Sequence, residues 1–79
     1  MSADLVLYVR EDCHLCEQFL LDLALDFPDL LAALRTVDVD TDPGLAASYG
    51  LRVPVLAAAG SAVCEGRYDR ARVGAALGL

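Results

Sequence analysis

Two cysteines with two residues between them, Cys13 and Cys16, are the side chains of this sequence best suited to chemistry. Such a pair can cycle between dithiol and disulfide, or it can give two thiolates to a metal site. The chain has three cysteines, whereas a secreted disulfide framework usually has an even number. In a reducing cytosol, neighbouring cysteines are more often catalytic or metal-binding than structural. We expect Cys64 to be a small core residue, with a secondary thiol near the site as the alternative.

A metal site competes with the redox interpretation. A closed structural zinc site needs four ligands, and beyond the pair the chain offers only His14, Cys64 and carboxylates. His14 cannot easily reach a metal held by its two neighbours, and no second Cys-x-x-Cys is present. The residues therefore favour a redox pair and predict no resident metal. A metal or iron–sulfur cluster shared between two chains, and inert cysteines, stay open as alternatives.

The elements around the pair favour redox chemistry. Residues 4–9 form an apolar run typical of a buried strand, and apolar residues recur at helical spacing over 16–27. The cysteines thus lie where a strand leads into a helix, whose free N–H groups and dipole stabilise a thiolate. In this setting a cysteine pKa can fall from about 8.5 to roughly 3.5–7.5. We expect Cys13 to be the nucleophile and Cys16, on the buried helix face, to resolve the mixed disulfide.

The two residues between the cysteines are predicted to lie outside. A protonated His14 would stabilise a neighbouring thiolate, although a solvent-facing histidine without a role is the alternative. Leu15 is expected to shape the exposed rim of the pair. Leu21 and Leu25 fall toward the outer side of the same helix, and the pattern does not say what covers them.

The middle of the chain predicts a strand and a short helix. Residues 35–40 alternate apolar and polar side chains, as in a strand with one face outside. Asp42 can cap a helix that has Pro43 at its first position. We expect this helix to reach Tyr49 and to end at Gly50 in the left-handed conformation.

A hairpin and a last helix complete the prediction. Strands at 51–60 and 62–65 form the hairpin, with a turn at residues 60–61. The helix at 69–77 is expected to point three side chains inward, those of Val73, Ala76 and Leu77. The order β-α-β-α-β-β-α predicts an α/β fold with a four-stranded mixed sheet flanked by helices, because a βαβ unit makes its strands parallel. With 79 residues, we expect one domain over 1–79.

Composition excludes several classes of protein. The net charge is −6 and the chain has no lysine, which argues against nucleic acid or an anionic membrane as a partner. A hydrophobic content of 57% argues against disorder. No apolar stretch approaches the roughly 20 residues of a membrane span, and no basic segment opens a signal peptide. We therefore expect a cytoplasmic protein.

Taken together, these residues resemble the glutaredoxin-like branch of the thioredoxin fold, in particular small bacterial proteins with Cys-x-Leu-Cys. Cys13-His-Leu-Cys16 follows the first strand, and Val53-Pro54 stands where that family has a cis-proline. Gly66 with Asp69 lies near the family's glycine-rich turn and last helix. The resemblance implies a thioredoxin-like fold with Pro54 beside the cysteines and the Val53 backbone paired with a bound peptide or glutathione.

The resemblance also implies a set of substrate-binding residues and a function. Arg10 takes the place of a lysine that binds a glutathione carboxylate, and Arg52 replaces a threonine and would add a second positive contact. With these belong His14, Leu15, Val53 and Pro54, whereas the acidic Glu11 and Asp12 would repel glutathione. The implied activity is a monomeric thiol–disulfide oxidoreductase of cell redox homeostasis. It would act on protein disulfides or glutathione mixed disulfides, with glutathione as possible co-substrate and no cofactor.

The alternative function is a thioredoxin-fold binding or adaptor module. In that case Cys13 and Cys16 would hold a metal or an iron–sulfur cluster without redox catalysis.

Overall fold

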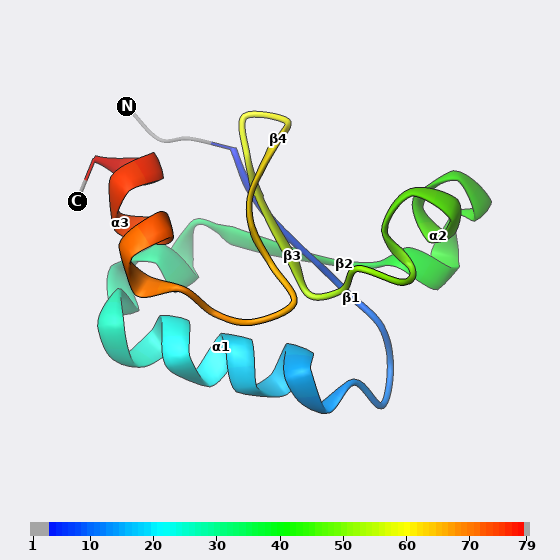
Figure 1. The fold of residues 1–79 in the computed structure, drawn as a ribbon, viewed down its shortest axis with the longest axis horizontal. Helices are drawn as coiled ribbons and strands as arrows, with labels where there is room; N and C mark the ends of the chain where they lie inside the picture. Colours follow the sequence, from blue (N-terminus) through cyan, green and yellow to red (C-terminus); the bar gives the residue numbers. More distant parts are fainter. Residues whose placement is uncertain (1–3, 79) are drawn as a thin grey trace.

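The computed structural model describes residues 4–78 and contains one four-stranded mixed sheet with three α-helices (Figure 1). Two short 3₁₀ helices, at Pro28–Ala32 and Val39–Thr41, join the main elements. The main elements are β1 (Leu5–Val9), α1 (His14–Asp26), β2 (Leu34–Asp38), α2 (Pro43–Tyr49), β3 (Val55–Ala58), β4 (Ser61–Glu65) and α3 (Arg70–Leu77). The predicted order β-α-β-α-β-β-α and the thioredoxin-like α/β fold are confirmed.

The sheet has the strand order β2-β1-β3-β4, so β1 is one of its two central strands. β1 runs parallel to β2 and antiparallel to β3, and β3 and β4 form the antiparallel hairpin. Tyr8, near the end of β1, pairs with Val55, the first residue of β3. The chain that leaves β1 toward Cys13 and the chain that enters β3 through Pro54 therefore meet at the same end of the sheet.

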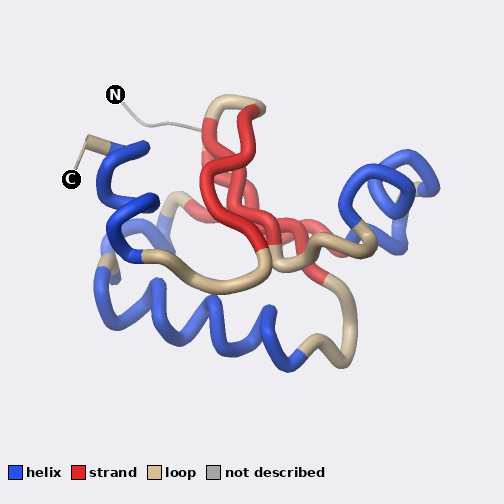
Figure 2. The backbone as a smooth tube through the Cα atoms, viewed as in Figure 1, coloured by secondary structure: helices blue, strands red, loops and turns tan. Residues whose placement is uncertain are grey.

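The helices cover the sheet unequally. α1 and α3 lie together, whereas α2 lies apart from both (Figure 2). The core cluster joins β1, β3 and β4 to α1 and α3, through Leu7, Phe19, Leu23, Leu56, Cys64 and Val73. The Tyr8 ring stacks on the ring of Tyr49 from α2 at a centroid distance of 4.3 Å. The sheet is therefore packed against α1 and α3 mainly by aliphatic side chains and against α2 by an aromatic pair.

Strand boundaries differ from the predicted ones for local reasons. The second strand ends at Asp38 and not at residue 40, because the chain turns there and the Asp38 carboxylate accepts the Asp40 N–H at 2.9 Å. The third strand begins at Val55, directly after Pro54, which has no N–H to donate to a ladder. The hairpin turn lies at residues 59–60, which have φ of 51° and 84°, one residue earlier than predicted.

Two predictions about helix residues were wrong. Gly50 has φ −54° and ψ −36°, which is right-handed, although the sequence predicts a left-handed cap. Its lack of a side chain is needed for space: a Cβ would lie 2.5 Å from the Ala46 carbonyl oxygen and 2.9 Å from Arg10 Nη2. Ala76 is exposed, because in the last turn of α3 it is Leu77 that packs on the core.

Candidate functional site

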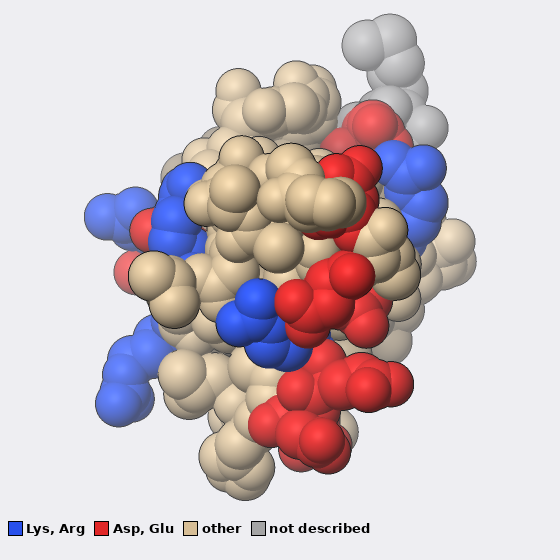
Figure 3. Space-filling model, turned by 90° about the vertical axis from the view of Figure 1, so that its right-hand side faces the viewer, with Lys and Arg blue, Asp and Glu red and all other residues tan. Residues whose placement is uncertain are grey.

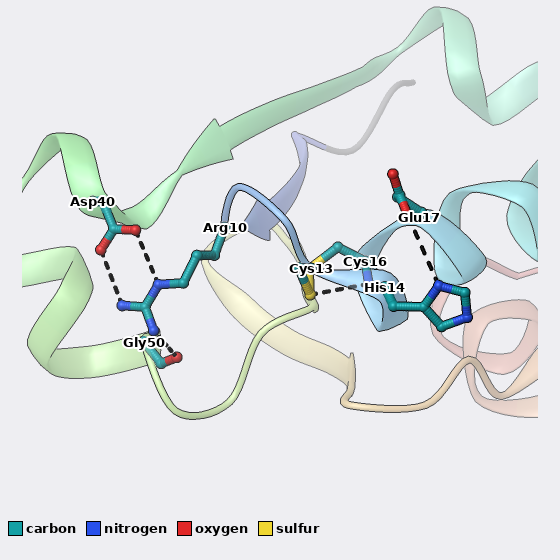
Figure 4. The surroundings of a disulfide bond; sticks show 7 residues. All are labelled: Arg10, Cys13, His14, Cys16, Glu17, Asp40 and Gly50. Carbon is teal, nitrogen blue, oxygen red and sulfur yellow. Dashed lines mark hydrogen bonds and ion pairs between the residues drawn. A yellow bond between two sulfur atoms is a disulfide. The ribbon is translucent and has the colours of Figure 1, made fainter.

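The cysteine pair lies at the start of α1, after a sharp turn of the chain. Asp12 has φ of 54°, a left-handed conformation that aspartate tolerates better than most residues. This turn places Cys13 at the N-cap of α1 and Cys16 in its first turn. The two sulfurs form a disulfide, with the Cα atoms 5.2 Å apart (Figure 4).

The two sulfurs differ in accessibility. Cys16 is 4% exposed and belongs to the buried core, whereas Cys13 is half-buried. The Cys16 N–H donates to Cys13 Sγ at 3.1 Å, so the first turn of the helix directs a backbone donor at this sulfur. After reduction, that donor and the helix N-terminus would stabilise a negative charge on Cys13. The geometry therefore makes Cys13 the sulfur that an external molecule can reach.

The residues between the cysteines face solvent, as the sequence predicts. His14 is exposed, and its Nδ1 lies 4.0 Å from Glu17 Oε2 on the same helix turn. The Leu15 side chain is 47% exposed and lines a small hollow with Gly66 and Tyr68. Leu15 thus forms part of the rim between α1 and the chain that follows β4.

A pocket of about 280 Å³ opens beside the disulfide. Both cysteines line it, together with Val9, Leu20 and Thr36 from neighbouring elements. Its charged lining consists of one cation and three acids, namely Arg10, Glu11, Asp12 and Glu17. The space next to the reactive pair is therefore bounded by carboxylates on the side of the β1–α1 turn.

Arg10 turns its guanidinium away from the cysteines (Figure 4). Nε and Nη2 each donate to one oxygen of the Asp40 carboxylate at 3.0 Å, and Nη1 donates to the Gly50 carbonyl at 3.0 Å. The hydrogen bonds and charge of Asp40 raise the pKa of Arg10. The group expected to hold a glutathione carboxylate is thus engaged with partners inside the protein.

Arg52 is engaged in a similar way. Its Nε and Nη2 donate to Glu65 Oε2 at 3.1 and 2.6 Å, and its guanidinium lies 5.3 Å from the centre of the Tyr49 ring. The hydrogen bond raises the pKa of Arg52 and lowers that of Glu65. Sequence reasoning missed both acidic partners, which lie 30 and 13 positions from their arginines. Nothing in the local pattern identifies them.

The Val53–Pro54 peptide bond is cis, and Pro54 is buried. The Pro54 carbonyl accepts the Gly66 N–H at 2.8 Å, which joins this segment to the turn after β4. The Val53 N–H donates to the Tyr49 carbonyl at 3.0 Å. No backbone N–H within residues 4–78 donates to the Val53 carbonyl, whereas the Val53 N–H is already bonded within the protein.

The described part of the chain lacks the features of two other kinds of site, a metal centre and a membrane-spanning helix. Among residues 4–78, no three or more histidine, cysteine or acidic side chains are grouped so that they could hold a metal ion. Within the same residues, no helix has both the length and the apolar character to cross a membrane.

Comparison with known proteins agrees with this geometry. An X-ray structure of target protein XcR50 from X. campestris is 40% identical, with a TM-score of 0.75 over 94% of this chain and 95% of that one. A solution NMR structure of protein Ne2328 from Nitrosomonas europaea is 33% identical, with a TM-score of 0.84 over 98% and 93%. The comparison with curated proteins found no match. The family model described as "Glutaredoxin-like domain (DUF836)" matches residues 4–78, and the chain therefore belongs to this glutaredoxin-like family.

Proposed function

We propose that this protein is a thiol–disulfide oxidoreductase that reduces disulfides through Cys13 and Cys16. The observation that carries the proposal is the difference between the two sulfurs. Cys13 is half-buried at a helix N-cap and accepts a backbone N–H at 3.1 Å, while Cys16 is 4% exposed. An accessible, stabilised thiolate beside a shielded thiol is the arrangement that stepwise exchange requires.

The exchange has two steps. The Cys13 thiolate attacks one sulfur of a substrate disulfide, which forms a mixed disulfide and releases the first substrate thiolate to take a proton from solvent. Cys16 then loses its proton and attacks Cys13 Sγ, which releases the second substrate thiol and closes the Cys13–Cys16 disulfide. Two electrons pass from the protein dithiol to the substrate, so each further turnover needs an external thiol reductant.

The Val53 segment supplies a means of orienting the substrate chain. Because the Val53 carbonyl has no backbone donor within residues 4–78 and the Val53 N–H is bonded to Tyr49, a bound peptide would donate one backbone N–H to this oxygen. The β1–α1 turn and Pro54 meet at the same end of the sheet. The Val53 carbonyl, directly before Pro54, therefore lies on the same side of the molecule as the cysteines. We propose a role in the reducing cytosol, where a dithiol of this kind is regenerated.

A redox titration tests the proposed function. The protein is equilibrated at pH 7 in buffers of varied ratio of reduced to oxidised glutathione, free thiols are alkylated, and the intact mass is measured. We expect a reversible two-electron transition that involves Cys13 and Cys16 only. Cys13→Ser should abolish reduction of a substrate disulfide. Cys16→Ser should retain the first step and accumulate a mixed disulfide. Cys64→Ala should leave the two-electron transition unchanged.

One result of the titration would contradict the proposed function. If Cys13 and Cys16 stay alkylatable across the whole range of ratios, the redox proposal is wrong. A metal ion that copurifies with the wild type and is lost in Cys13→Ser would then identify the binding module.

A further inference from the structure

We infer that the preferred substrate of this site is a disulfide in a polypeptide with lysine or arginine next to its cysteine, and that the site disfavours glutathione. This inference rests on the proposed function and names its substrate class. The observations that carry it are the charges around the pocket beside the disulfide and the engagement of both nearby arginines.

The first observation is the lining of that pocket. Glu11, Asp12 and Glu17 contribute three carboxylates within the same 280 Å³ space that Cys13 borders. All three side chains belong to exposed residues, so a molecule that reaches Cys13 meets their charge. Glu17 has the exposed His14 as its one ion-pair partner within the described residues, at 4.0 Å.

The second observation is the state of the cations. Arg10 is the one cation that lines this pocket, and both its bidentate contact with Asp40 and its bond to Gly50 hold it in place. Arg52 is paired with Glu65 at 2.6 Å. Each arginine therefore carries a carboxylate partner of its own, and neither offers an unpaired positive charge to a ligand.

The third observation is the charge of the surface as a whole. In the view of Figure 3, acidic side chains gather on one side of the face, whereas basic groups are scattered and several of them lie beside acidic ones. The whole chain is also acidic, with a net charge of −6 and no lysine. The carboxylates of the pocket and the net charge of the chain thus both attract cations to the site.

This distribution selects between two kinds of thiol compound. Glutathione carries more carboxylates than ammonium groups and is anionic at pH 7, so the pocket repels it and its disulfide. A basic peptide is attracted, and its cation can pair with Glu11 or Glu17 while its sulfur meets Cys13. A substrate cation paired with Glu11 or Glu17 would lie well within the roughly 8 Å over which physiological salt screens a charge, so the selection persists at that ionic strength.

The test measures single-turnover exchange of the reduced protein with three peptide disulfides of equal length. The cysteine is flanked by arginine, by glutamate or by glycine and serine, and each rate is divided by the rate of the same peptide with dithiothreitol. At low ionic strength we expect the arginine peptide to react faster than the glutamate peptide by on the order of tenfold. The ratio falls toward one in about 0.5 M NaCl, and oxidised glutathione behaves like the glutamate peptide.

Two matched double variants locate the effect. Glu11→Gln/Glu17→Gln removes two charges at the pocket, and the expected ratio drops to about threefold. Asp4→Asn/Asp29→Asn removes two charges at the opposite ends of β1 and α1 from the cysteines, and leaves the ratio at the wild-type value. Asp12 is kept, because its left-handed backbone shapes the turn.

The outcomes separate this inference from the proposed function. Equal rates for all peptides, or an equal fall of the ratio in both double variants, overturn the charge selection while the redox activity stands. Failure to react with every peptide, including the glycine–serine one, overturns the proposed function itself. Faster reaction with oxidised glutathione than with the arginine peptide overturns the inference directly.

Discussion

At the scale of single residues, three cysteines of the same chain have three different environments. Cys13 is half-buried at a helix N-cap, Cys16 is shielded one turn later, and Cys64 lies 3% exposed in the core cluster. The Cys64 thiol donates to the Arg67 carbonyl at 3.1 Å, and burial raises its pKa. The prediction that Cys64 is a core residue is confirmed, and its environment makes it unreactive.

Alkylation of the reduced protein should therefore be selective. A raised pKa leaves less thiolate at any pH below it, so Cys64 reacts more slowly than Cys13 for reasons of both ionisation and access. With limiting iodoacetamide at pH 8, we expect Cys13 to be labelled at least about tenfold faster than Cys64. Mass spectrometry of the peptides measures both rates, and unfolding in urea should equalise them. Comparable labelling of Cys64 in the folded protein would contradict its assignment to the core.

The cysteines and Arg10 show which features of single residues a sequence can predict. The Cys-x-x-Cys pair, its helix and the burial of Cys16 follow from spacing within one segment, and all are present in the structure. The partners of Arg10 could not be predicted, because Asp40 and Gly50 approach it from 30 and 40 positions away. A free arginine and a paired one look identical in a sequence, although only the free one offers an uncompensated positive charge to an anionic ligand.

At the scale of elements, Arg10 joins three segments that meet at the cysteine end of the sheet. Its guanidinium contacts the turn after β2 through Asp40 and the end of α2 through Gly50. The chain then passes from Gly50 to Val53 and Pro54. Arg10 thus joins the β1–α1 turn to the segment that leads to Val53 and Pro54, while its charge is directed away from the disulfide.

Replacement by alanine should have different effects at two glycines of the α2 region. At Gly50 a Cβ would meet the Ala46 backbone at 2.5 Å and Arg10 at 2.9 Å, and the backbone cannot easily move. At Gly44 the nearest atom is the Asp42 side chain at 3.2 Å, and alanine favours a helix. We expect Gly50→Ala to lower the free energy of unfolding by about 1–3 kcal/mol.

Gly44→Ala is the matched control, with an expected change below about 1 kcal/mol. Urea unfolding followed by circular dichroism measures both variants. A loss in Gly44→Ala as large as that in Gly50→Ala would show that the close approach to Arg10 is not the reason for glycine at position 50. The sequence could not reveal why position 50 is glycine, because a left-handed helix cap and a tight packing contact both favour this residue.

At the scale of the whole molecule, the topology was predictable and the details of burial were not. The alternation of strand and helix patterns determines a βαβ unit followed by a hairpin, and the observed strand order β2-β1-β3-β4 agrees with it. Which side of α3 faces the core depends on where β4 and α1 lie. The wrong placement of Ala76 and the burial of Gly74 follow from that tertiary arrangement.

A chain of 79 residues has a narrow stability margin, about 4–12 kcal/mol at the usual value per residue. Phe19 is 1% exposed, belongs to the core cluster and meets the Tyr68 ring edge-on at a centroid distance of 5.4 Å. Phe19→Ala should therefore cost about 3–5 kcal/mol. Leu25→Ala, on the solvent side of the same helix with Leu25 81% exposed, should change stability by less than about 0.5 kcal/mol.

The same substitution links stability to the chemistry of the site. Phe19 and Cys16 lie three residues apart on the buried face of α1, so the residues that shield the Cys16 sulfur belong to the core that Phe19 fills. In reduced Phe19→Ala, alkylation of Cys16 should rise in step with the unfolded fraction measured by urea titration, while Leu25→Ala keeps the wild-type rate. Unchanged protection of Cys16 in a destabilised Phe19→Ala protein would mean that the first turn of α1 shields this sulfur locally, without the core.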